Sequence, residues 1–585
     1  MKIDLPAELA SWANASKTKA DSFTRLLKIL QRHGYPDLPS DSRTLLETPR
    51  QTSLLVRNVP PGQYIHIGIE AGALYTLRQN GIDVNGLQFM IIDYNTDGVQ
   101  ISKSTTQVFW PIWCRIRNPY IGQPFLCGIF YSNSGGPKDA NLFILDFVNE
   151  LKYLITNGLK VNNKTKIPIR AGRFMGDAPG RCDIMGLKGP TGYYGCSRCT
   201  TKGLHCENRV CFPELNAALR SDKDFKDRAQ PQHHHFTSFL EEVLELLGVT
   251  QAPIDGMHLV YACVTRRILF WLNTDCVNYK FRLSSAQIGT VNNLLEIAAL
   301  TRPVEFARPV KGIHKYKKFK CTQLRQFLLY LSIVVLKKVF SEFQYEHLLL
   351  LVIGIRLLSD EKQFVKNNAL AKKMLHDYVQ ILETKFGKWR VIYSVHNLIH
   401  LADEVLTQNE PLDRFSMWEF ETANNGLKEF TKRQGAYLQQ CYNRTFEKYN
   451  YRRDNPAHLI KYPILKFHIE NEYAGINIAK QFFSRVIFEH FMLDQSSGNK
   501  WFVTTSGEIG LFEQAVLVDE KIKIRCRFIK RKFNYFEKPL NSSLLLIFQC
   551  NEDDLTNLFE IDSDHIQSKM FMIKDGGSSV FIPLL

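Results

Sequence analysis

The sequence has no apolar run long enough to cross a membrane. Its longest uncharged apolar stretches, residues 327–336 and 348–355, fall well short of the roughly 18 to 20 residues that a bilayer-spanning helix needs. The N-terminus, Met-Lys-Ile-Asp, has an early acid and no following apolar run before a cleavage site, so no secretory leader is expected. We therefore expect a protein of a reducing compartment with no membrane association.

The chain also lacks the dense, even cysteine pattern of a disulfide framework. Its 13 cysteines are spread over 585 residues, which fits free thiols and metal ligands better than disulfides. The composition excludes a disordered or fibrous chain, because 45% of the residues are hydrophobic and 12% are aromatic. For this length we expect about three to five domains.

Acidic residues are scarce relative to basic ones. The 74 lysines and arginines exceed the 58 aspartates and glutamates, which leaves a formal charge of +16. This excess favours a polyanionic partner, nucleic acid first, through counterion release and electrostatic steering. Residues 1–81 nevertheless contain no Cys/His pair at zinc-finger spacing and no clear DNA-recognition helix.

The order of the predicted elements in the first third of the chain indicates the fold class. After a short helical pair, strands are predicted at residues 87–97, 105–116 and 125–131, then a helix from the N-cap Asp139 to Gly158, and a strand at 166–174. This β-β-β-α-β order matches the ribonuclease-H-like fold, in which the first and fourth strands are neighbours in one sheet.

Five segments are predicted along the chain. Long apolar-periodic runs at 239–247, 324–340 and 369–382 indicate a helical region, and alternating basic and apolar residues at 521–527 indicate a late strand. The fold class is therefore α/β plus helical. The segments are an N-terminal helical or mixed segment (1–85), a ribonuclease-H-like core with a CxxC (86–213), an all-α insertion (214–413), the helical second part of the core (414–492) and a small C-terminal β domain (493–585).

Acids at two predicted strand ends have the residue type that metal-dependent phosphoryl transfer needs. Asp97 follows the first strand and Asp177 follows the fourth. Carboxylates that hold two divalent cations about 4 Å apart help to activate a water or a 3′-hydroxyl and to stabilise the leaving oxygen. Asp93 is an alternative first acid, but the Asp-Gly turn at residues 97–98 favours Asp97.

The third acid should come from a helix after the insertion, and Glu421 is the best candidate. At about 100° per residue, Asn425, Lys428 and Lys432 return to within roughly 40° of Glu421 on the helix. An acid flanked by an amide and ammonium groups suits a metal ligand whose neighbours bind DNA phosphates. A solvated helix face would give the same pattern, and Glu419 is a rival third acid.

A second group of residues has the pattern of a zinc site. Cys196 and Cys199 form a CxxC, which supplies half of a tetrahedral site. His396 and His400 are four residues apart and share a helical face, as a histidine pair on one metal would. Cys206 and Cys211 are a nearer alternative source of the other two ligands.

With these residues in hand, the chain resembles the transposases of the CACTA (En/Spm) superfamily, and in particular the animal transposase-domain-containing proteins, over nearly its whole length. The motifs that carry the resemblance are Leu38-Pro39 with 43–46, Asp97-Gly98 with 110–112, 176–179, Cys196-x-x-Cys199, 255–259, 327–330, 396–401, Phe415-Ser416 and Phe420-Glu421.

The resemblance implies a DDE/D transposase that cleaves and joins double-stranded DNA at element ends and target sites. Asp97, Asp177 and Glu421 would bind two Mg²⁺ or Mn²⁺ ions, and Cys196, Cys199, His396 and His400 would form a structural zinc site. Asp255 and His258 match the family's [C/D]xxH motif and would orient active-site groups, although His258 is equally explained as a packed polar residue. A nuclear protein that forms a homo-oligomer on DNA is expected.

Two other functions fit the same residues. The first is a catalytically inactive, domesticated transposase that acts as a DNA- or chromatin-binding protein. The second is a nuclease of ribonuclease-H-like fold without strand transfer. The lack of an evident DNA-recognition finger weighs against autonomous, sequence-specific transposition, whereas the presence of all three acids and both halves of the zinc site favours catalytic competence.

Overall fold

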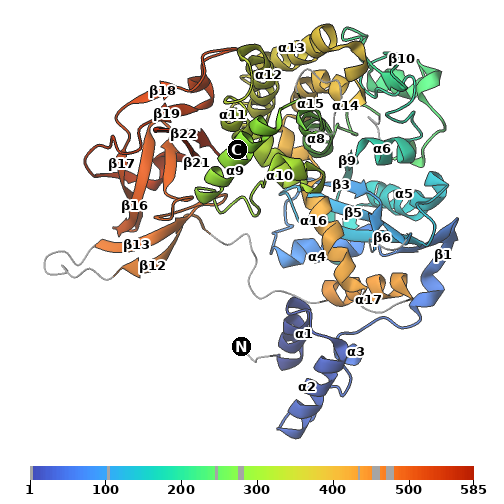
Figure 1. Ribbon diagram of the computed structural model, residues 1–585. Helices are drawn as coiled ribbons and strands as arrows, with labels where there is room; N and C mark the ends of the chain where they lie inside the picture. The colour runs from blue at the N-terminus through green and yellow to red at the C-terminus, as the bar shows by residue number, and fades with distance from the viewer. Residues whose placement is uncertain are drawn as a thin grey trace. The chain divides into compact units, whose positions relative to one another are not determined.

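The computed structural model describes residues 4–101, 106–243, 248–273, 282–431, 435–450, 461–469 and 480–585, and the chain divides into two compact units (Figure 1). The first unit comprises Met1–Thr200, Ala218–Asp255 and Ser416–Leu459. The second comprises Thr201–Ala217, Gly256–Phe415 and Ile460–Leu585. In the described ranges, no helix combines the length and apolar character required to traverse a bilayer.

The first unit is built on a seven-stranded sheet with the order β1-β2-β6-β5-β3-β9, in which β4 pairs with β5. Only β3 and β9 run parallel; the other pairs are antiparallel. The strands are β1 (Val56–Val59), β2 (Gly62–His66), β3 (Met90–Thr96), β4 (Val99–Gln100), β5 (Val108–Asn118), β6 (Phe125–Ser132) and β9 (Ile169–Met175). The predicted pairing of the first and fourth core strands is confirmed by β3 and β9.

Helices cover both faces of this sheet. On one face, Phe147 of α5 (Ala140–Asn157) packs on Tyr94 of β3, which stacks on Phe174 of β9. On the other face, α16 (Trp418–Leu427) lies against β5, where Asn424 accepts a hydrogen bond from the indole of Trp113 at 2.7 Å. The remaining helices of the unit are α1 (Leu5–Ala15), α2 (Ala20–Arg32), α3 (Ser42–Leu45), α4 (Ile69–Gln79), α6 (Ala178–Met185), α7 (Asp222–Lys226) and α17 (Tyr437–Tyr449).

Local sequence signals explain several of these elements. Asp139 caps α5, since its carboxylate accepts a hydrogen bond from the Leu142 amide at 2.9 Å, and Gly158 ends the helix with a positive φ. In the N-terminal pair of helices, Phe23 and Leu27 of α2 are buried. Two strands were not predicted, however, because β1 and β2 are short and joined at Pro60 and Pro61.

The second unit combines helices with a large antiparallel sheet. Its helices are α8 (Arg266–Leu272), α9 (Ser285–Leu300), α10 (Cys321–Gln326), α11 (Ser332–Val335), α12 (Glu342–Ser359), α13 (Asn368–Phe386), α14 (Tyr393–His396) and α15 (Leu401–Gln408). Short 3₁₀ and π segments interrupt them, including η4 (Met257–Thr265), η5 (Ile313–Lys318) and η8 (Asn397–His400). The hairpin of β10 (Leu204–Cys206) and β11 (Arg209–Cys211) belongs to this unit.

The C-terminal sheet has eleven strands, and its longest path is β12-β13-β16-β15-β21-β22-β19-β18. The strands are β12 (Ile464–Ile469), β13 (Lys480–Ile487), β14 (Met492–Asp494), β15 (Trp501–Thr504), β16 (Ile509–Val518), β17 (Lys521–Phe528), β18 (Lys532–Asn534), β19 (Phe548–Cys550), β20 (Phe559–Asp562), β21 (Ile566–Asp575) and β22 (Ser578–Pro583). The predicted helical segment 414–492 is therefore wrong beyond α17, since β12 and β13 already belong to the sheet.

The predicted insertion, 214–413, also needs correction. Residues 218–255 cluster with the first unit, and only Gly256–Phe415 pack with the C-terminal sheet. Within the run 239–247 the structure has a single 3₁₀ turn, Phe239–Glu242, and residues 244–247 lie outside the described ranges. The runs at 324–340 and 369–382 do contain helices, in α10, α11 and α13. The insertion is thus not one separate all-α domain.

Candidate active site and metal centre

The ends of β3 and β9 place Asp97 and Asp177 at equivalent positions on neighbouring strands. In the parallel register Asn95 is opposite Met175, and each aspartate lies two residues further on. A β-carbon added at Gly180 would lie 2.9 Å from Asp177 Oδ1 and 3.7 Å from the carbonyl oxygen of Thr96. The carbonyl oxygen of Thr96, the residue before Asp97, and the Asp177 carboxylate therefore both lie close to Gly180.

Strand alternation assigns both aspartates to the face that α16 covers. Tyr94 and Phe174 face α5, so odd-numbered residues at the ends of β3 and β9 point to the opposite side. Asp177 is the N-cap of α6 and accepts from the Gly180 amide at 2.8 Å, while Asp97 accepts from the Gly98 amide at 2.7 Å. Both side chains are half-buried.

Glu421 lies in the first turn of α16, on the helix that crosses this face, and is half-buried. Two contacts hold the helix in place. Asn424, three residues later, accepts from Trp113 of β5, and the buried Asp255 carboxylate accepts from the Met417 amide just before the helix at 3.0 Å. Asp255 thus holds the residue that precedes α16. His258 is half-buried in η4 of the second unit.

The rival acids Asp93 and Glu419 are paired with arginine instead, Asp93 in the interior and Glu419 with a side chain that is 40% exposed. Asp93 is fully buried and contacts the guanidinium groups of Arg115 at 3.2 Å and Arg117 at 3.1 Å. Arg115 also contacts Glu419 at 3.2 Å. An ion pair with such burial is a structural feature, because its charges are already compensated. Asp97 and Glu421 are therefore better candidates than their rivals.

Gly172 of β9 is required next to this network. A β-carbon at position 172 would lie 2.3 Å from Asp93 Oδ1, so any larger residue would displace the carboxylate. The Arg173 amide, next along the strand, donates to the same oxygen at 2.8 Å. Sequence reasoning did not identify this network, since its members come together only through the strand register.

Negative charge accumulates beside Asp177. Partial desolvation and the neighbouring Asp177 carboxylate raise the pKa of Asp183 on α6. The smaller of these two causes, repulsion between the two carboxylates, places Asp183 near Asp177. Sequence reasoning missed Asp183, although its place on the helix that Asp177 begins was the available signal.

The three acids are not drawn together around one point. Within the described ranges, the only group of three or more His, Cys, Asp and Glu side chains suited to hold a metal ion is the Cys/His cluster described below. Of the predicted phosphate-binding residues, Asn425 and Lys428 are exposed on or directly after α16, and Lys432 lies outside the described residues. A metal ion held by all three acids would thus have to draw their carboxylates closer together.

Cys196 and Cys199 are buried thiols in the loop after α6. Their sulfur atoms are 3.6 Å apart, well beyond the roughly 2.05 Å of a disulfide, and the described cysteines are all free. The Arg198 amide donates to the Cys196 sulfur at 3.4 Å. The CxxC loop therefore has the geometry of two ligands for one ion.

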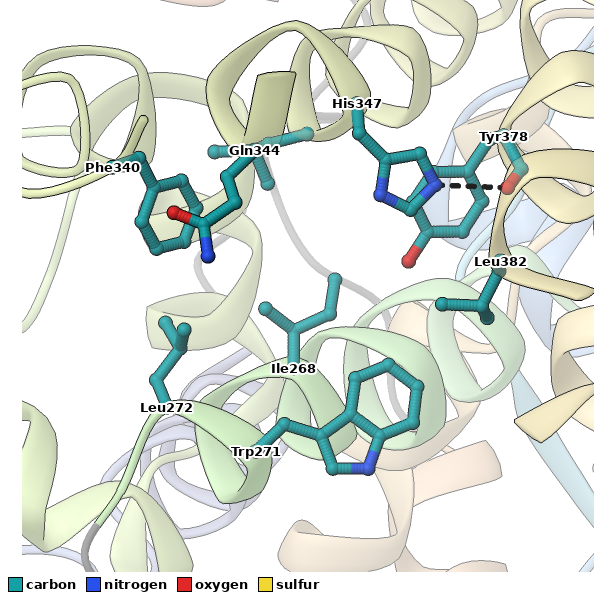
Figure 2. Close-up of a pocket in the computed structure, with 9 residues that line it drawn as sticks. Ile268, Trp271, Leu272, Phe340, Gln344, His347, Tyr378 and Leu382 are labelled. Carbon is teal, nitrogen blue, oxygen red and sulfur yellow. Dashed lines mark hydrogen bonds between the residues drawn. The ribbon is translucent and has the colours of Figure 1, made fainter. Parts of the chain in front are cut away.

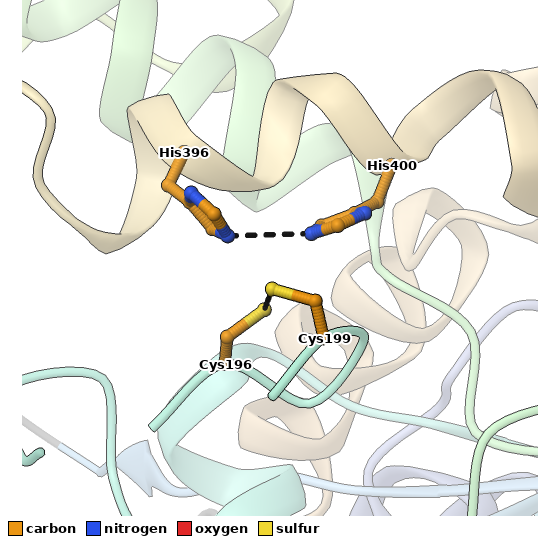
Figure 3. Close-up of side chains that lie close together, drawn as sticks. All are labelled: Cys196, Cys199, His396 and His400. Carbon is orange, nitrogen blue, oxygen red and sulfur yellow. Dashed lines mark hydrogen bonds between the residues drawn. The ribbon is translucent and has the colours of Figure 1, made fainter. Parts of the chain in front are cut away.

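His396 and His400 face each other in the second unit, with their Nε2 atoms 3.3 Å apart. Nδ1 of His396 donates to the carbonyl of Phe212 at 2.9 Å, which leaves Nε2 as the metal-binding atom. Figure 3 shows both rings directed toward the two cysteines, and the four ligand atoms all lie within 4.8 Å of one another.

Within each ligand pair the separation suits a tetrahedral ion of the size of zinc. Bonds of about 2.3 Å to sulfur and about 2.0 Å to nitrogen give ligand separations of roughly 3.8 Å between sulfurs and 3.3 Å between nitrogens. The observed separations are 3.6 Å and 3.3 Å. The alternative ligands Cys206 and Cys211 are not in the cluster; Cys211 instead donates to the Trp389 carbonyl at 3.3 Å.

A buried arginine connects the CxxC loop to the candidate active site within the first unit. Arg181 of α6, the helix that Asp177 caps, donates to Ser197 of the CxxC loop at 3.1 Å and to the Pro253 carbonyl at 2.9 Å. Pro253 lies two residues before Asp255, which holds the start of α16. The loop with the thiols and two of the segments that carry the acids are therefore joined by direct hydrogen bonds.

Two of the four basic residues of β17, Arg525 and Arg527, are paired with neighbouring acids. Arg525 contacts Glu560 at 3.4 Å and Arg527 contacts Glu513 at 3.2 Å. Lys480 of β13 also contacts Glu560 at 3.3 Å. These pairs favour a solvated face of the sheet over a nucleic-acid surface.

A small apolar cavity in the second unit does not qualify as a ligand site. It lies between α8, α12 and α13, and Figure 2 shows Trp271, His347 and Tyr378 around it. Its volume is about 30 Å³, enough for roughly two water molecules. Burial lowers the pKa of His347 to about 4, so the ring is neutral, and Nε2 donates to the Tyr378 carbonyl at 2.9 Å. His347 is thus a satisfied residue of the helical core.

A known protein family matches part of the C-terminal sheet. Residues 468–584 are similar to a family described as a domain of unknown function (DUF8592). No curated protein matches the chain. The match covers the second unit's β-strands from the end of β12 to β22 and none of the candidate site residues.

Proposed function

We propose that this protein is a metal-dependent enzyme that cuts and joins DNA, a DDE/D-type transposase or a protein derived from one, with a ribonuclease-H-like core. Its substrate would be double-stranded DNA at element ends and at a target site, and it would act in the nucleus as a homo-oligomer on DNA. The observation that carries the proposal is the register of β3 and β9. It brings Asp97 and Asp177 to adjacent strand ends, on the face crossed by the helix of Glu421.

In this proposal Asp97, Asp177 and Glu421 hold two Mg²⁺ or Mn²⁺ ions. Their donor set consists only of carboxylate oxygens, which suits these hard cations. When bound, such ions activate an attacking water or 3′-hydroxyl and stabilise the leaving oxygen. The protein's own contribution is placement: Asp177 is fixed by the Gly180 amide, and Asp255 and Asn424 hold the helix that carries Glu421.

A zinc ion bound by Cys196, Cys199, His396 and His400 would be structural. All four ligands are buried. Four protein ligands leave no coordination position open for a substrate, which is typical of structural zinc sites. Its effect would reach the candidate active site through Ser197 and Arg181. The zinc would thus stabilise the loop against which α6 is held.

The nuclease step is tested by plasmid nicking with purified protein. We expect Mg²⁺- or Mn²⁺-dependent nicking that falls by at least about a thousandfold in Asp97→Asn, Asp177→Asn or Glu421→Gln, because each removes a metal ligand. Glu419→Gln is the matched control on the same helix and should retain most of the activity. Loss of nicking in the control but not in Glu421→Gln would refute the assigned triad.

Strand transfer distinguishes a transposase from a plain nuclease. A protein that also joins a pre-cut 3′-hydroxyl end to a plasmid is a transposase, whereas a nuclease would only nick. Joined products that require Asp97 support the proposal. Nicking without any joined product would favour the nuclease.

The zinc site is tested by metal analysis. We expect about one zinc per chain in the wild-type protein and loss of that zinc in Cys199→Ser, since one missing thiolate opens the tetrahedral site. Cys206→Ser is the matched control and should keep its zinc. An unchanged zinc content in Cys199→Ser would refute the ligand set.

A non-enzymatic DNA- or chromatin-binding protein is the second candidate function. The observation in its favour is that the three acids do not converge among the described residues. This function predicts DNA affinity that is unaffected by Asp97→Asn, together with no cleavage by either protein.

A further inference from the structure

An exposed run of basic residues surrounds η5 in the second unit. Between positions 308 and 320 the sequence has no aspartate or glutamate, and its basic residues are Arg308, Lys311, Lys315, Lys317, Lys318 and Lys320. All of the lysines are exposed, whereas Ile313, Tyr316 and Phe319 are buried at intervals of three residues. Residues 308–320, here called the lysine segment, therefore present charge on one side and packing on the other.

The lysine segment is held in place by side chains from the neighbouring helices. Arg266 of α8 donates to the carbonyls of Lys317 at 3.2 Å and Phe319 at 3.1 Å. Asn292 of α9 accepts from the Ile313 amide at 2.9 Å, and Asn273 donates to the Ile313 carbonyl at 3.0 Å. The backbone is thus ordered before any partner binds, which reduces the entropic cost of binding.

Five of the six basic residues of this segment have no acidic partner among the described residues. Across the ranges that the structure describes, Arg308, Lys311, Lys315, Lys318 and Lys320 make no side-chain ion pair. Arg525 and Arg527 of β17, by contrast, contact Glu560 and Glu513. A row of uncompensated cations on a fixed backbone creates a positive potential that attracts a polyanion.

We propose that the lysine segment binds the phosphate backbone of double-stranded DNA. The inference rests on the proposed function for the identity of the polyanion and adds where the DNA is held. In a 3₁₀ segment residues three apart lie above one another about 6 Å apart, so Lys315 and Lys318 of η5 (Ile313–Lys318) extend from the same side. The rings of Tyr316 and Phe319 are buried and offer no platform for unpaired bases, which distinguishes the segment from surfaces for single strands.

Binding through lysine and phosphate charges should be independent of DNA sequence and strongly dependent on salt. The test uses the full chain, a labelled 30-base-pair duplex and fluorescence anisotropy at several salt concentrations without Mg²⁺. The variant carries Lys311→Gln, Lys315→Gln, Lys318→Gln and Lys320→Gln. We expect its affinity to fall by at least about tenfold. The slope of log K against log salt concentration should become shallower by about 3 to 4, because each lost phosphate contact contributes about 0.9.

The matched control removes four exposed lysines elsewhere in the same unit: Lys362→Gln, Lys366→Gln, Lys372→Gln and Lys373→Gln. Its net charge equals that of the test variant, and it should bind DNA within about twofold of wild type. The same four lysine-segment positions changed to arginine should preserve binding. Equal loss in the control, or unchanged binding by the test variant, would overturn the inference.

Anionic phosphatidylserine vesicles and a single-stranded 30-mer provide the competing polyanions. A defect confined to vesicles, or a larger defect with the single strand than with the duplex, would overturn the assignment to duplex DNA. Nicking is measured separately, so that the two proposals can fail independently. A DNA-binding defect in the test variant supports DNA binding by the lysine segment even if neither protein nicks DNA. If the wild type nicks DNA and the test variant binds DNA normally, only the inference about the lysine segment is refuted.

Discussion

Two aspartates four residues apart on β3 have opposite environments. Asp93 is fully buried between Arg115 and Arg117, whereas Asp97 is half-buried at the strand end. The sequence identified both as possible metal ligands and favoured Asp97 because a glycine follows it. The ion pairs compensate the charge of buried Asp93 without a metal ion, so Asp97 is the better candidate for a metal ligand.

The difference between the two aspartates predicts different effects of the same substitution. Asp93→Asn should lower the free energy of unfolding by about 3 to 5 kcal/mol, because it leaves buried arginine charge uncompensated. Asp97→Asn should abolish nicking but change the free energy of unfolding by less than about 1 kcal/mol. Urea denaturation followed by circular dichroism measures both. Equal destabilisation by the two substitutions would contradict these assignments.

At the scale of elements, α16 depends on a contact from a segment about 160 residues earlier in the chain. The Asp255 carboxylate accepts from the Met417 amide, which begins the helix that carries Glu421. A carboxylate at a helix N-terminus satisfies a free amide and interacts favourably with the helix dipole. The placement of Glu421 should therefore be sensitive to Asp255.

Asp255→Ala should loosen the first turn of α16 and reduce nicking by about a hundredfold, since small displacements of a reacting group are costly. Hydrogen exchange in peptides covering residues 418–427 should become faster. Zinc content should stay at the wild-type level, which serves as the control for folding. Slower nicking without faster exchange in α16 would assign Asp255 a role other than positioning.

Sequence patterns predicted the elements that have clear alternation or caps. The strands β3, β5, β6 and β9 and the capped helix α5 lie close to their predicted positions. The strands β12 and β13 were assigned to a helical segment because neither alternates cleanly between buried and exposed residues. The contacts of Arg115 and Arg181 could not be predicted, because they depend on strand register and on loops far apart in the sequence.

At the scale of the whole molecule, the chain is organised as two units rather than as five successive domains. The C-terminal strands share a unit with the helices of residues 256–415. The buried Lys569 of β21 contacts Glu305 at 2.7 Å, and Thr301 donates to the Met572 carbonyl at 2.6 Å. Contacts between residues so distant in sequence leave no local signal, which explains why the sequence suggested a separate β domain.

The central claim is that Asp97, Asp177 and Glu421 meet around bound divalent ions. Iron-directed cleavage tests it most directly: the protein is loaded with Fe²⁺ in place of Mg²⁺, ascorbate and peroxide generate hydroxyl radicals at the ion, and the backbone cuts are mapped. The account predicts cuts near residues 97, 177 and 421 together, suppressed by excess Mg²⁺ and absent in Asp97→Asn. Cuts at only one of these segments, or an unchanged pattern in Asp97→Asn, would contradict it.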